Sequence, residues 1–160
     1  MKPLDDIDRR ILLELQRDGR LSNQDLADRV GLSPSPCLRR VRMLEEAGVI
    51  TGYRAVVDQD AVGLAITAFA RLTLESHGRE IVDRVEAEIR KIPEVVEAYL
   101  LAGDQDYLLK ITVASFASYE QLLRTSLRAI PSLSSIQTTF AFGVTKPISP
   151  LPIPATPTTR

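Results

Sequence analysis

The sequence predicts an α+β fold in which a small helical domain precedes a sheet that is covered by helices. Two patterns support this prediction. Up to residue 48, apolar residues recur at the spacing of one helix face, whereas beyond residue 65 they alternate with polar residues as in strands, between further helical stretches. The chain has 160 residues, of which 44% are hydrophobic, and this is enough for two modest cores.

The first helix is predicted over Asp6 to Arg17. Its apolar residues Ile7, Ile11 and Leu15 fall on one face. Several acidic residues stand at its start, where the positive end of the helix dipole favours them. The turn-forming residues 18–20 are expected to end this helix.

Two further helices follow, joined by a tight turn. Ser22 is expected to cap the second helix, which ends at Gly31, and Ser33 is expected to cap the third. Pro34 then occupies the first helical position, where its missing N–H costs nothing, and the third helix runs to Gly48. This pair of helices predicts a helix-turn-helix, whose second helix fits the major groove of DNA.

The third helix is expected to bury Leu38, Val41 and Leu44 and to turn its basic residues outward. Cys37 is expected on the flank of this helix, as a packing residue rather than a redox sensor. The chain carries a net charge of −1, so it cannot coat nucleic acid by bulk charge. A contact with DNA must instead be local, and residues 34–44 hold three arginines and no acid.

The chain is expected to divide into four segments. Residues 49–57 are rich in β-forming residues and predict a short strand or wing after the helices. The segments are a winged helix-turn-helix domain over 1–54, a connector over 55–64, an α/β domain over 65–146 and a proline-rich tail over 147–160, which is expected to be extended or disordered.

The predicted α/β domain has strands over 65–74, 95–101, 107–113 and 136–144 and helices over 80–92 and 118–130. The order β-α-β-β-α-β predicts a ferredoxin-like βαββαβ sandwich. The strand over 107–113 is apolar on both faces, so we expect helices to cover one face and a second copy of the chain to cover the other.

Several ordered motifs closely resemble one family of regulators. They are residues 4–12 (LDDIDRRIL), 25–27 (DLA), 30–41 (VGLSPSPCLRRV), 48–53 (GVITGY) and 103–110 (GDQDYLLK). On these motifs the chain resembles the Lrp/AsnC, or feast/famine, family of transcriptional regulators from residue 4 to about residue 146. The resemblance implies a DNA-binding domain tethered to a sensor domain that forms homodimers, with four dimers often assembling into an octamer.

The resemblance also implies sequence-specific binding to double-stranded DNA and control of genes for amino-acid metabolism or transport. The third helix would enter the major groove, its arginines pairing with guanine or phosphate, while the serines and N–H groups near its start suit phosphate oxygens. The positions expected to contact DNA are Asn23, Ser33, Ser35, Pro36, Arg39, Arg40 and Arg42.

In this family a free amino acid usually binds between sensor domains, beside a Gly-Asp-x-Asp turn, and no other cofactor is expected. A carboxylate of the turn would pair with the ammonium group of the effector. The matching positions are Tyr99, Leu101, Ala102, Gly103, Asp104, Asp106, Tyr107, Gln137, Thr138 and Thr139.

Catalytic and metal chemistry find little support in the sequence. One cysteine and one histidine, His77, cannot form a zinc cluster, and His77 is expected at a surface turn without a role. No nucleophile with a neighbouring base is evident, so no enzyme activity is expected. No apolar stretch reaches the roughly 20 residues of a membrane helix, and the start is charged, so we expect a cytoplasmic protein without a membrane partner.

Three alternatives stay open beside an effector-controlled regulator. In the first alternative, the chain is a DNA-binding regulator that responds to no effector. In the second, its helical domain binds another protein. In the third, it is an enzyme on the ferredoxin-like scaffold, which hosts many activities. Changing Arg39 and Arg42 to alanine separates these hypotheses. Loss of DNA affinity with intact oligomers supports the regulator, whereas retained affinity counts against it.

Overall fold

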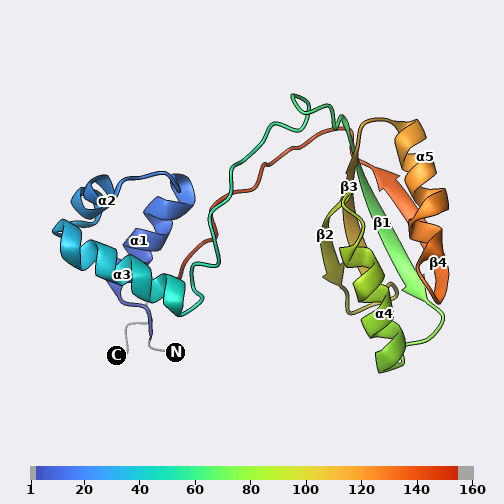
Figure 1. The fold of residues 1–160 in the computed structure, drawn as a ribbon, viewed down its shortest axis with the longest axis horizontal. Coiled ribbons are helices and arrows are strands. Elements are labelled where there is room, and N and C mark those ends of the chain that lie inside the picture. The colour runs from blue at the N-terminus through green and yellow to red at the C-terminus, as the bar shows by residue number, and fades with distance from the viewer. Residues whose placement is uncertain (1–2, 155–160) are drawn as a thin grey trace. The chain divides into compact units, whose positions relative to one another are not determined.

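The computed structural model describes residues 3–154, and the chain divides into two compact units. The first unit runs to Val56 and also takes in the chain from Lys146 onward, whereas the second runs from Val57 to Thr145. The C-terminal segment thus returns to the helical unit in which the chain begins (Figure 1). The sequence patterns did not predict this return.

The helices of the first unit lie where the sequence predicts them. They are α1 (Asp6–Arg17), α2 (Asn23–Val30) and α3 (Pro34–Glu46). Asp5 caps α1 in a capping box, in which its carboxylate accepts from the Asp8 N–H and the Asp8 carboxylate accepts from the Asp5 N–H. Ser22 caps α2 as expected by accepting from the Asp25 N–H. Ser33, in contrast, makes no capping hydrogen bond at α3, and that part of the expectation is wrong.

The turn between α2 and α3 is held from both sides. Gly31 ends α2 in the left-handed region at a φ of 76°, which glycine adopts without strain. The N–H of Leu32 donates to the carbonyl of Ala27 at 2.9 Å. The side-chain amide of Asn23 donates to the carbonyl of Pro34 at 2.8 Å and so ties the start of α2 to the start of α3.

The core of the first unit corrects the predicted orientation of α3. Its buried residues are Ile11, Leu12, Leu26, Ala27, Val30, Cys37 and Leu44. Cys37 is fully buried and Leu38 is 39% exposed, so the expectation that Leu38 is buried and Cys37 lies on the flank is wrong. Cys37, Val41 and Leu44 follow the i, i+4, i+7 spacing of one face, whereas residues three apart drift around the helix.

The strand predicted over residues 49–57 does not form in this chain. The amides of Val49 and Ile50 both donate to the carbonyl of Leu44, at 2.9 and 3.1 Å, and so close the end of α3. From there to Val57 the described chain has no strand assignment. A strand needs a partner strand to satisfy its backbone groups, and residues 3–154 place no strand beside this segment.

The second unit confirms the α+β fold with a ferredoxin-like βαββαβ order. Its elements are β1 (Ile66–Leu74), α4 (Arg79–Arg90), β2 (Val95–Leu100), β3 (Tyr107–Val113), α5 (Phe116–Thr125), a short 3₁₀ helix η1 (Leu127–Ala129) and β4 (Leu133–Phe140). The four strands form an antiparallel sheet in the order β2-β3-β1-β4. The two central strands are β1 and β3, and β2 and β4 form the edges.

Two boundaries of this unit differ from the sequence prediction. The second helix begins at Phe116 rather than residue 118, because Ser115 caps it by accepting from the Ser118 N–H, and the α-helix ends at Thr125. The last strand covers Leu133–Phe140 rather than 136–144, since its register against β1 begins at Leu133. Both differences arise from pairing and capping partners that periodicity alone does not reveal.

The sheet has one face buried under helices and one face open in this chain. Ala68, Ala70 and Leu72 of β1 are fully buried in a core that they share with residues of α4 and α5. The alternate residues Phe69 and Arg71 are half-exposed on the opposite face. The helices therefore leave the second face of the sheet available to a partner.

The open face is less apolar than the sequence suggests. In β3, Leu109 and Ile111 point into the core, while Leu108 and Lys110 lie on the open face. Lys110 forms an ion pair with Glu97 of β2 at 2.8 Å on that face. The expectation that this strand is apolar on both faces is therefore wrong at Lys110, and the open face mixes apolar and charged groups.

Residues 151–154 of the proline-rich tail pack on the helical unit, mainly along α1. The Gln16 side-chain amide accepts from the Leu151 N–H at 2.6 Å and donates to the Leu151 carbonyl at 3.3 Å. The Arg9 guanidinium donates to the carbonyl of Pro154 at 2.8 Å, and Ile153 packs against the helical core. The tail was predicted over 147–160; residues 155–160 of that prediction lie outside the described residues.

Candidate DNA-binding surface and effector-binding turn

The outer side of α3 presents a mixed surface in which two arginines stand beside two apolar side chains, Leu38 and Met43. Six side chains line a shallow hollow of about 280 Å³ on this side: Ser35, Leu38, Arg39, Arg42, Met43 and Glu46. Arg39 and Arg42 are exposed, and neither forms an ion pair with another described residue. Their guanidinium groups therefore remain available to an anionic partner.

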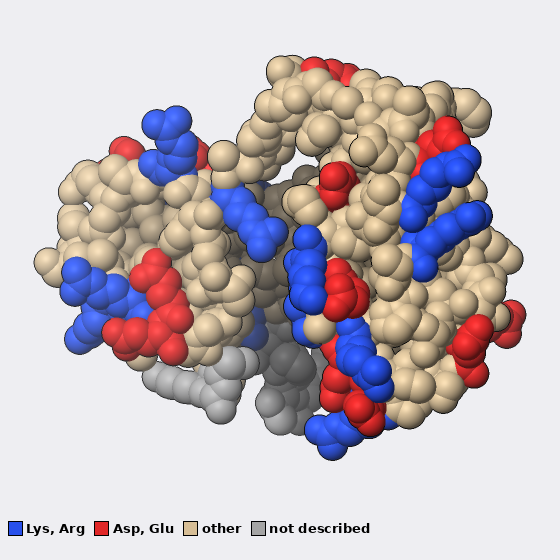
Figure 2. All heavy atoms as spheres, turned by 45° about the vertical axis from the view of Figure 1, so that its right-hand side comes forward, with Lys and Arg blue, Asp and Glu red and all other residues tan. Residues whose placement is uncertain are grey.

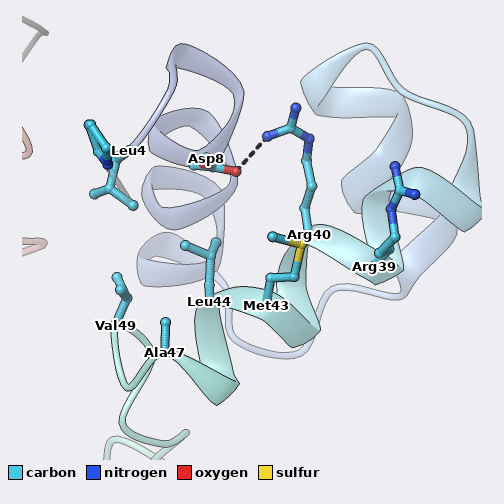
Figure 3. A pocket seen from close by; sticks show the side chains of 9 residues that line it. Leu4, Asp8, Arg39, Arg40, Met43, Leu44, Ala47 and Val49 are labelled. Atoms are coloured by element: carbon cyan, nitrogen blue, oxygen red, sulfur yellow. Dashed lines mark hydrogen bonds and ion pairs between the residues drawn. The ribbon is translucent and has the colours of Figure 1, made fainter. Parts of the chain in front are cut away.

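Arg40 differs from these two arginines because it is held inside the unit. Its guanidinium lies 2.6 Å from a carboxylate oxygen of Asp5. It also lies 2.7 Å from a carboxylate oxygen of Asp8, and Figure 3 shows this second ion pair. The hydrogen bond to Asp5 raises the pKa of Arg40, while the Asp8 N–H and then Arg40 lower the pKa of Asp5. The structure thus places Arg40 at the junction of α1 and α3 rather than on the outer side of α3.

The other positions that the sequence assigns to DNA binding also divide into exposed side chains and side chains that are engaged within the unit. Ser33 and Ser35 are exposed at the start of α3, where Pro34 and Pro36 carry no N–H and the Cys37 N–H donates to the Ser33 carbonyl at 3.2 Å. Pro36 is half-buried. The side-chain amide of Asn23 donates to the carbonyl of Pro34, so this side chain fixes the turn between α2 and α3.

A cavity of about 360 Å³ opens where the start of α1 meets α3 (Figure 3). Its walls are mostly apolar and include Leu4, Met43, Leu44 and Val49, with the Asp8–Arg40 ion pair at one side. This cavity lies between the helices of the unit and is separate from the hollow on the outer side of α3, although Arg39 and Met43 border both.

Charge is mixed over the molecular surface. On the face drawn in Figure 2, basic and acidic side chains lie among one another and form no large field of one sign. This agrees with the net charge of −1. Attraction to a polyanion must therefore come from a few local side chains rather than from the whole chain.

The turn between β2 and β3 is anchored through Asp106. One oxygen of its carboxylate accepts from the Leu74 N–H at 2.7 Å, and the other lies 2.7 Å from Nε2 of His77. The Asp106 N–H also donates to the carbonyl of Leu72 at 2.9 Å. The Leu74 N–H, followed by His77, lowers the pKa of Asp106. The side chain of Asp106 is only 15% exposed, so its carboxylate joins the turn to the end of β1.

The preceding part of the turn has a free carboxylate and an apolar approach. Asp104 is exposed and makes no hydrogen bond or ion pair with another described side chain. Leu100 and Leu101, which lead into the turn, are 65% and 36% exposed, and Tyr99 is 51% exposed. A charged group and several apolar groups therefore lie close together at this end of the sheet.

The predicted effector residues of β3 and β4 do not all reach this turn. Gln137 lies near the turn, because the side-chain amide of Gln105 donates to Oε1 of Gln137 at 3.2 Å. Thr139 is exposed on the same strand as Gln137. Thr138 lies on the helix side, where its hydroxyl meets that of Tyr119 at 2.5 Å. Tyr107 is only 3% exposed.

His77 and Gln105 are contact residues that the sequence analysis missed. His77 was expected to have no role, yet it meets Asp106, which lies 29 positions further along the chain. Gln105 was considered only as a turn residue, yet it reaches Gln137 across 32 positions. Contacts over such separations leave no local pattern in the sequence.

Residues 3–154 contain neither a cluster of metal ligands nor a helix suited to cross a membrane. No group of three or more metal-ligating side chains comes together in this part of the chain. No helix described there combines the length and the apolar character that crossing a membrane requires.

Comparisons with known proteins agree on both units. Residues 4–51 match the model of a winged helix-turn-helix DNA-binding domain, and residues 67–151 match that of the Lrp/AsnC ligand binding domain. The leucine-responsive regulatory protein of Escherichia coli K12 is 42% identical over 137 residues, which cover 86% of this chain and 84% of that protein. The protein of the same name from Haemophilus influenzae is 43% identical, with 86% and 82% covered.

Solved structures give the same result. A transcriptional regulator from Neisseria meningitidis in complex with L-Met superposes with a TM-score of 0.88 at 35% identity, covering 94% of this chain and 97% of that one. An AsnC family regulator from Agrobacterium tumefaciens also gives 0.88, at 37% identity, with 93% and 97% covered. With its DNA-binding and ligand-binding units both matched, this chain belongs to the Lrp/AsnC family of transcriptional regulators.

Proposed function

We propose that this regulator binds operator DNA through the outer side of α3, with Arg39 and Arg42 as its main contacts. The observation that carries this proposal is that both guanidinium groups are exposed and unpaired among described residues, on the helix that follows the turn. Guanidinium forks pair with guanine edges or with phosphates in the major groove. Ser33 and Ser35, which are exposed at the start of α3, contact phosphate through their hydroxyl groups.

In this proposal Asn23 and Arg40 act indirectly. Asn23 holds the turn and Arg40 holds α1 against α3, so both orient the helix that enters the groove. Pro36 belongs to the first turn of α3 and contributes its shape. The test is a fluorescence anisotropy titration of a duplex selected by the protein from a random library, with Arg39→Ala, Arg42→Ala and Arg40→Ala compared at several salt concentrations.

We further propose that the effector is an amino acid with an apolar side chain, bound at the turn of residues 101–106. Asp104 would pair with its ammonium group, while Tyr99, Leu100 and Leu101 would contact its side chain. Ala102, Gly103, Gln137 and Thr139 complete this end of the sheet. The relatives support an apolar effector, since two of them are named leucine-responsive regulatory proteins and one similar structure is a complex with L-Met.

A thermal-shift screen against the twenty amino acids tests this part of the proposal. A ligand at 100 times its Kd stabilises the native protein by about 2.7 kcal/mol, which is easily detected. We expect leucine or methionine to raise the melting temperature of the protein and the Asp104→Asn variant to lose that rise. No rise with any amino acid, beside intact DNA binding, favours a regulator without an amino-acid effector.

We propose that a second copy covers the open face of the sheet and that four such dimers form an octamer. The half-exposed Phe69 and Leu108 and the exposed Tyr99 on that face favour a partner. Light scattering then yields the mass of eight chains, whereas the mass of one chain at micromolar concentration contradicts the proposal.

The proposed function also implies where the protein acts and which genes it controls. We infer that the protein acts on DNA in the cytoplasm, controls genes for amino-acid metabolism or transport, and has no catalytic activity of its own. The names of the leucine-responsive relatives support this assignment. Transcript profiling of a deletion strain tests it, with amino-acid transport and metabolism genes expected among those that change.

A further inference from the structure

Leu38 is an apolar side chain in an unexpected position. It stands on α3 directly after Cys37, which is fully buried, yet Leu38 itself is 39% exposed. The core of the first unit is complete without it, since Leu38 belongs neither to the buried cluster nor to the partly buried residues packed against it. Its exposure therefore needs a reason other than packing within the unit.

The neighbours of Leu38 place it in the middle of the proposed DNA-binding surface. Ser35 precedes it by one helical turn, Arg42 follows it by one turn, and Arg39 is adjacent. The four side chains line the same hollow on the outer side of α3. Any duplex that approaches Arg39 and Arg42 along this helix must also bury Leu38.

A leucine can make only one favourable kind of contact with a base edge in the major groove. The edges carry hydrogen-bond donors and acceptors, which leucine cannot pair with, and one apolar group, the C5 methyl of thymine. Placing leucine against a polar edge would leave that edge unpaired at a cost, whereas placing it against the methyl removes two apolar surfaces from water.

We propose that Leu38 contacts the C5 methyl group of a thymine and so specifies a T·A pair in each half-site of the operator. This assignment rests on the proposed DNA-binding role of α3. Leu38 then supplies specificity, while Arg39 and Arg42 supply affinity through guanine or phosphate. Met43, which is 53% exposed in the same hollow, lies more than one turn further along the helix and serves as a comparison.

The test removes the methyl from DNA and the side chain from the protein, separately and together. The full-length protein first selects a duplex from a random library. Each symmetry-related pair of thymines in that duplex is then replaced by deoxyuridine, which lacks only the C5 methyl. Dissociation constants are measured by anisotropy for the wild type, Leu38→Ala and the matched control Met43→Ala. Circular dichroism checks that the variants keep their helices.

The expected result is a loss confined to one thymine position. Because a buried methyl-sized group changes an equilibrium by roughly fourfold, deoxyuridine at that position weakens wild-type binding about fourfold per half-site and about fifteenfold for both. In Leu38→Ala, binding to the thymine duplex is already weaker and deoxyuridine has no further effect there. Met43→Ala keeps the wild-type loss at that position.

Two outcomes overturn the assignment and are distinguishable from each other. If a duplex is selected but Leu38→Ala shows the wild-type loss at every thymine, Leu38 reads no methyl group, and the DNA-binding role of α3 still stands. If no duplex is enriched at moderate salt, the proposed DNA-binding function itself fails, and the assignment fails with it.

Discussion

The outer side of α3, where we propose that DNA binds, can be compared with the turn of residues 101–106, where we propose that the effector binds. Each has charged residues close together in sequence, and in each one charge is engaged while another is free. Arg40 is bound by Asp5 and Asp8, whereas Arg39 and Arg42 are exposed. Likewise Asp106 is bound by Leu74 and His77, whereas Asp104 is exposed.

The difference between the two regions lies in how complete they are. The α3 surface has its arginines, its serines and Leu38 on one helix of one chain. The turn presents the exposed carboxylate of Asp104 and the exposed apolar side chains of Leu100 and Leu101. We therefore propose that a single copy can meet a DNA half-site, whereas the effector site is completed by a second copy.

The largest expected effect is on DNA affinity and separates free from engaged arginines. A lost bidentate contact costs about 1–3 kcal/mol, so Arg39→Ala or Arg42→Ala loses about 2–6 kcal/mol over the two half-sites of a dimer. Anisotropy titrations measure this loss. Arg124→Ala, which removes an exposed arginine of α5 that is paired with Glu120, is the matched control and keeps wild-type affinity.

Within α3, the engaged Arg40 should behave differently from the free Arg39 and Arg42. We expect Arg40→Ala to weaken DNA binding less than Arg39→Ala and to retain the salt dependence of the wild type. A loss of affinity equal to that of Arg39→Ala, with a reduced salt slope, would show that Arg40 leaves its acidic partners to contact phosphate.

Stability should separate the two aspartates of the turn. Asp106→Ala leaves the Leu74 N–H without its acceptor and lowers the free energy of unfolding by about 1–3 kcal/mol. Asp104→Ala, the matched control, changes it by less than about 0.5 kcal/mol because the side chain is exposed. Urea denaturation without ligand measures both. Equal destabilisation by the two changes would contradict the anchoring role of Asp106.

Arg40→Ala should also lower stability, by about 1 kcal/mol. The side chains of Arg40 and Asp8 are 30% and 19% exposed, so solvent screens the ion pair only in part. The expected loss appears in the urea midpoint of the helical unit by circular dichroism. Arg29→Ala, which removes a more exposed pair with Glu14, serves as the comparison and should cost less.

The tail contact predicts a smaller effect in the same assay. Gln16→Ala removes both hydrogen bonds to Leu151 and is expected to cost about 0.5–1 kcal/mol, since the contact is exposed. Gln24→Ala on α2 is the control, because the Gln24 amide meets only Asp28 one turn further along its own helix. If Gln16→Ala matches this control, the tail adds nothing to the helical unit.

The smallest effect is a pH dependence that arises at Asp106. Its pKa in the folded protein lies below the ordinary value of 3.8, so the stabilisation is fully present above that value. It disappears as the pH falls through the lower folded-state pKa, because the carboxylate then takes up a proton. Acid unfolding followed at closely spaced pH values should therefore be less steep for Asp106→Asn than for the wild type.

Local patterns predicted most helices and the order of helices and strands along the chain. Periodicity and caps placed α1 and α2, and the run of strands and helices predicted the ferredoxin-like order. The error at Cys37 and Leu38 arose because residues at three-residue spacing can be mistaken for one face of a helix. The strand after α3 failed because β-propensity does not provide a partner strand.

The sequence predicted which types of side chain form the candidate sites, but it predicted the role of each side chain less well. Three arginines in a row of four residues indicate a basic surface, but only the fold shows that Asp5 and Asp8 engage the middle one. The strand of Gln137–Thr139 was predicted, yet its alternation sends Thr138 to Tyr119 and away from its neighbours. Such roles depend on contacts between distant residues, which sequence periodicity does not encode.

The coupling between the two regions is the most direct test of the account. The selected duplex is titrated with protein in the absence and presence of a saturating apolar amino acid, for the wild type and for Asp104→Asn. Because binding at linked sites is reciprocal, the account predicts a shift in the wild-type DNA dissociation constant of about 5- to 150-fold and none in Asp104→Asn. Superimposable wild-type curves with each of the twenty amino acids would contradict control of DNA binding by an amino acid.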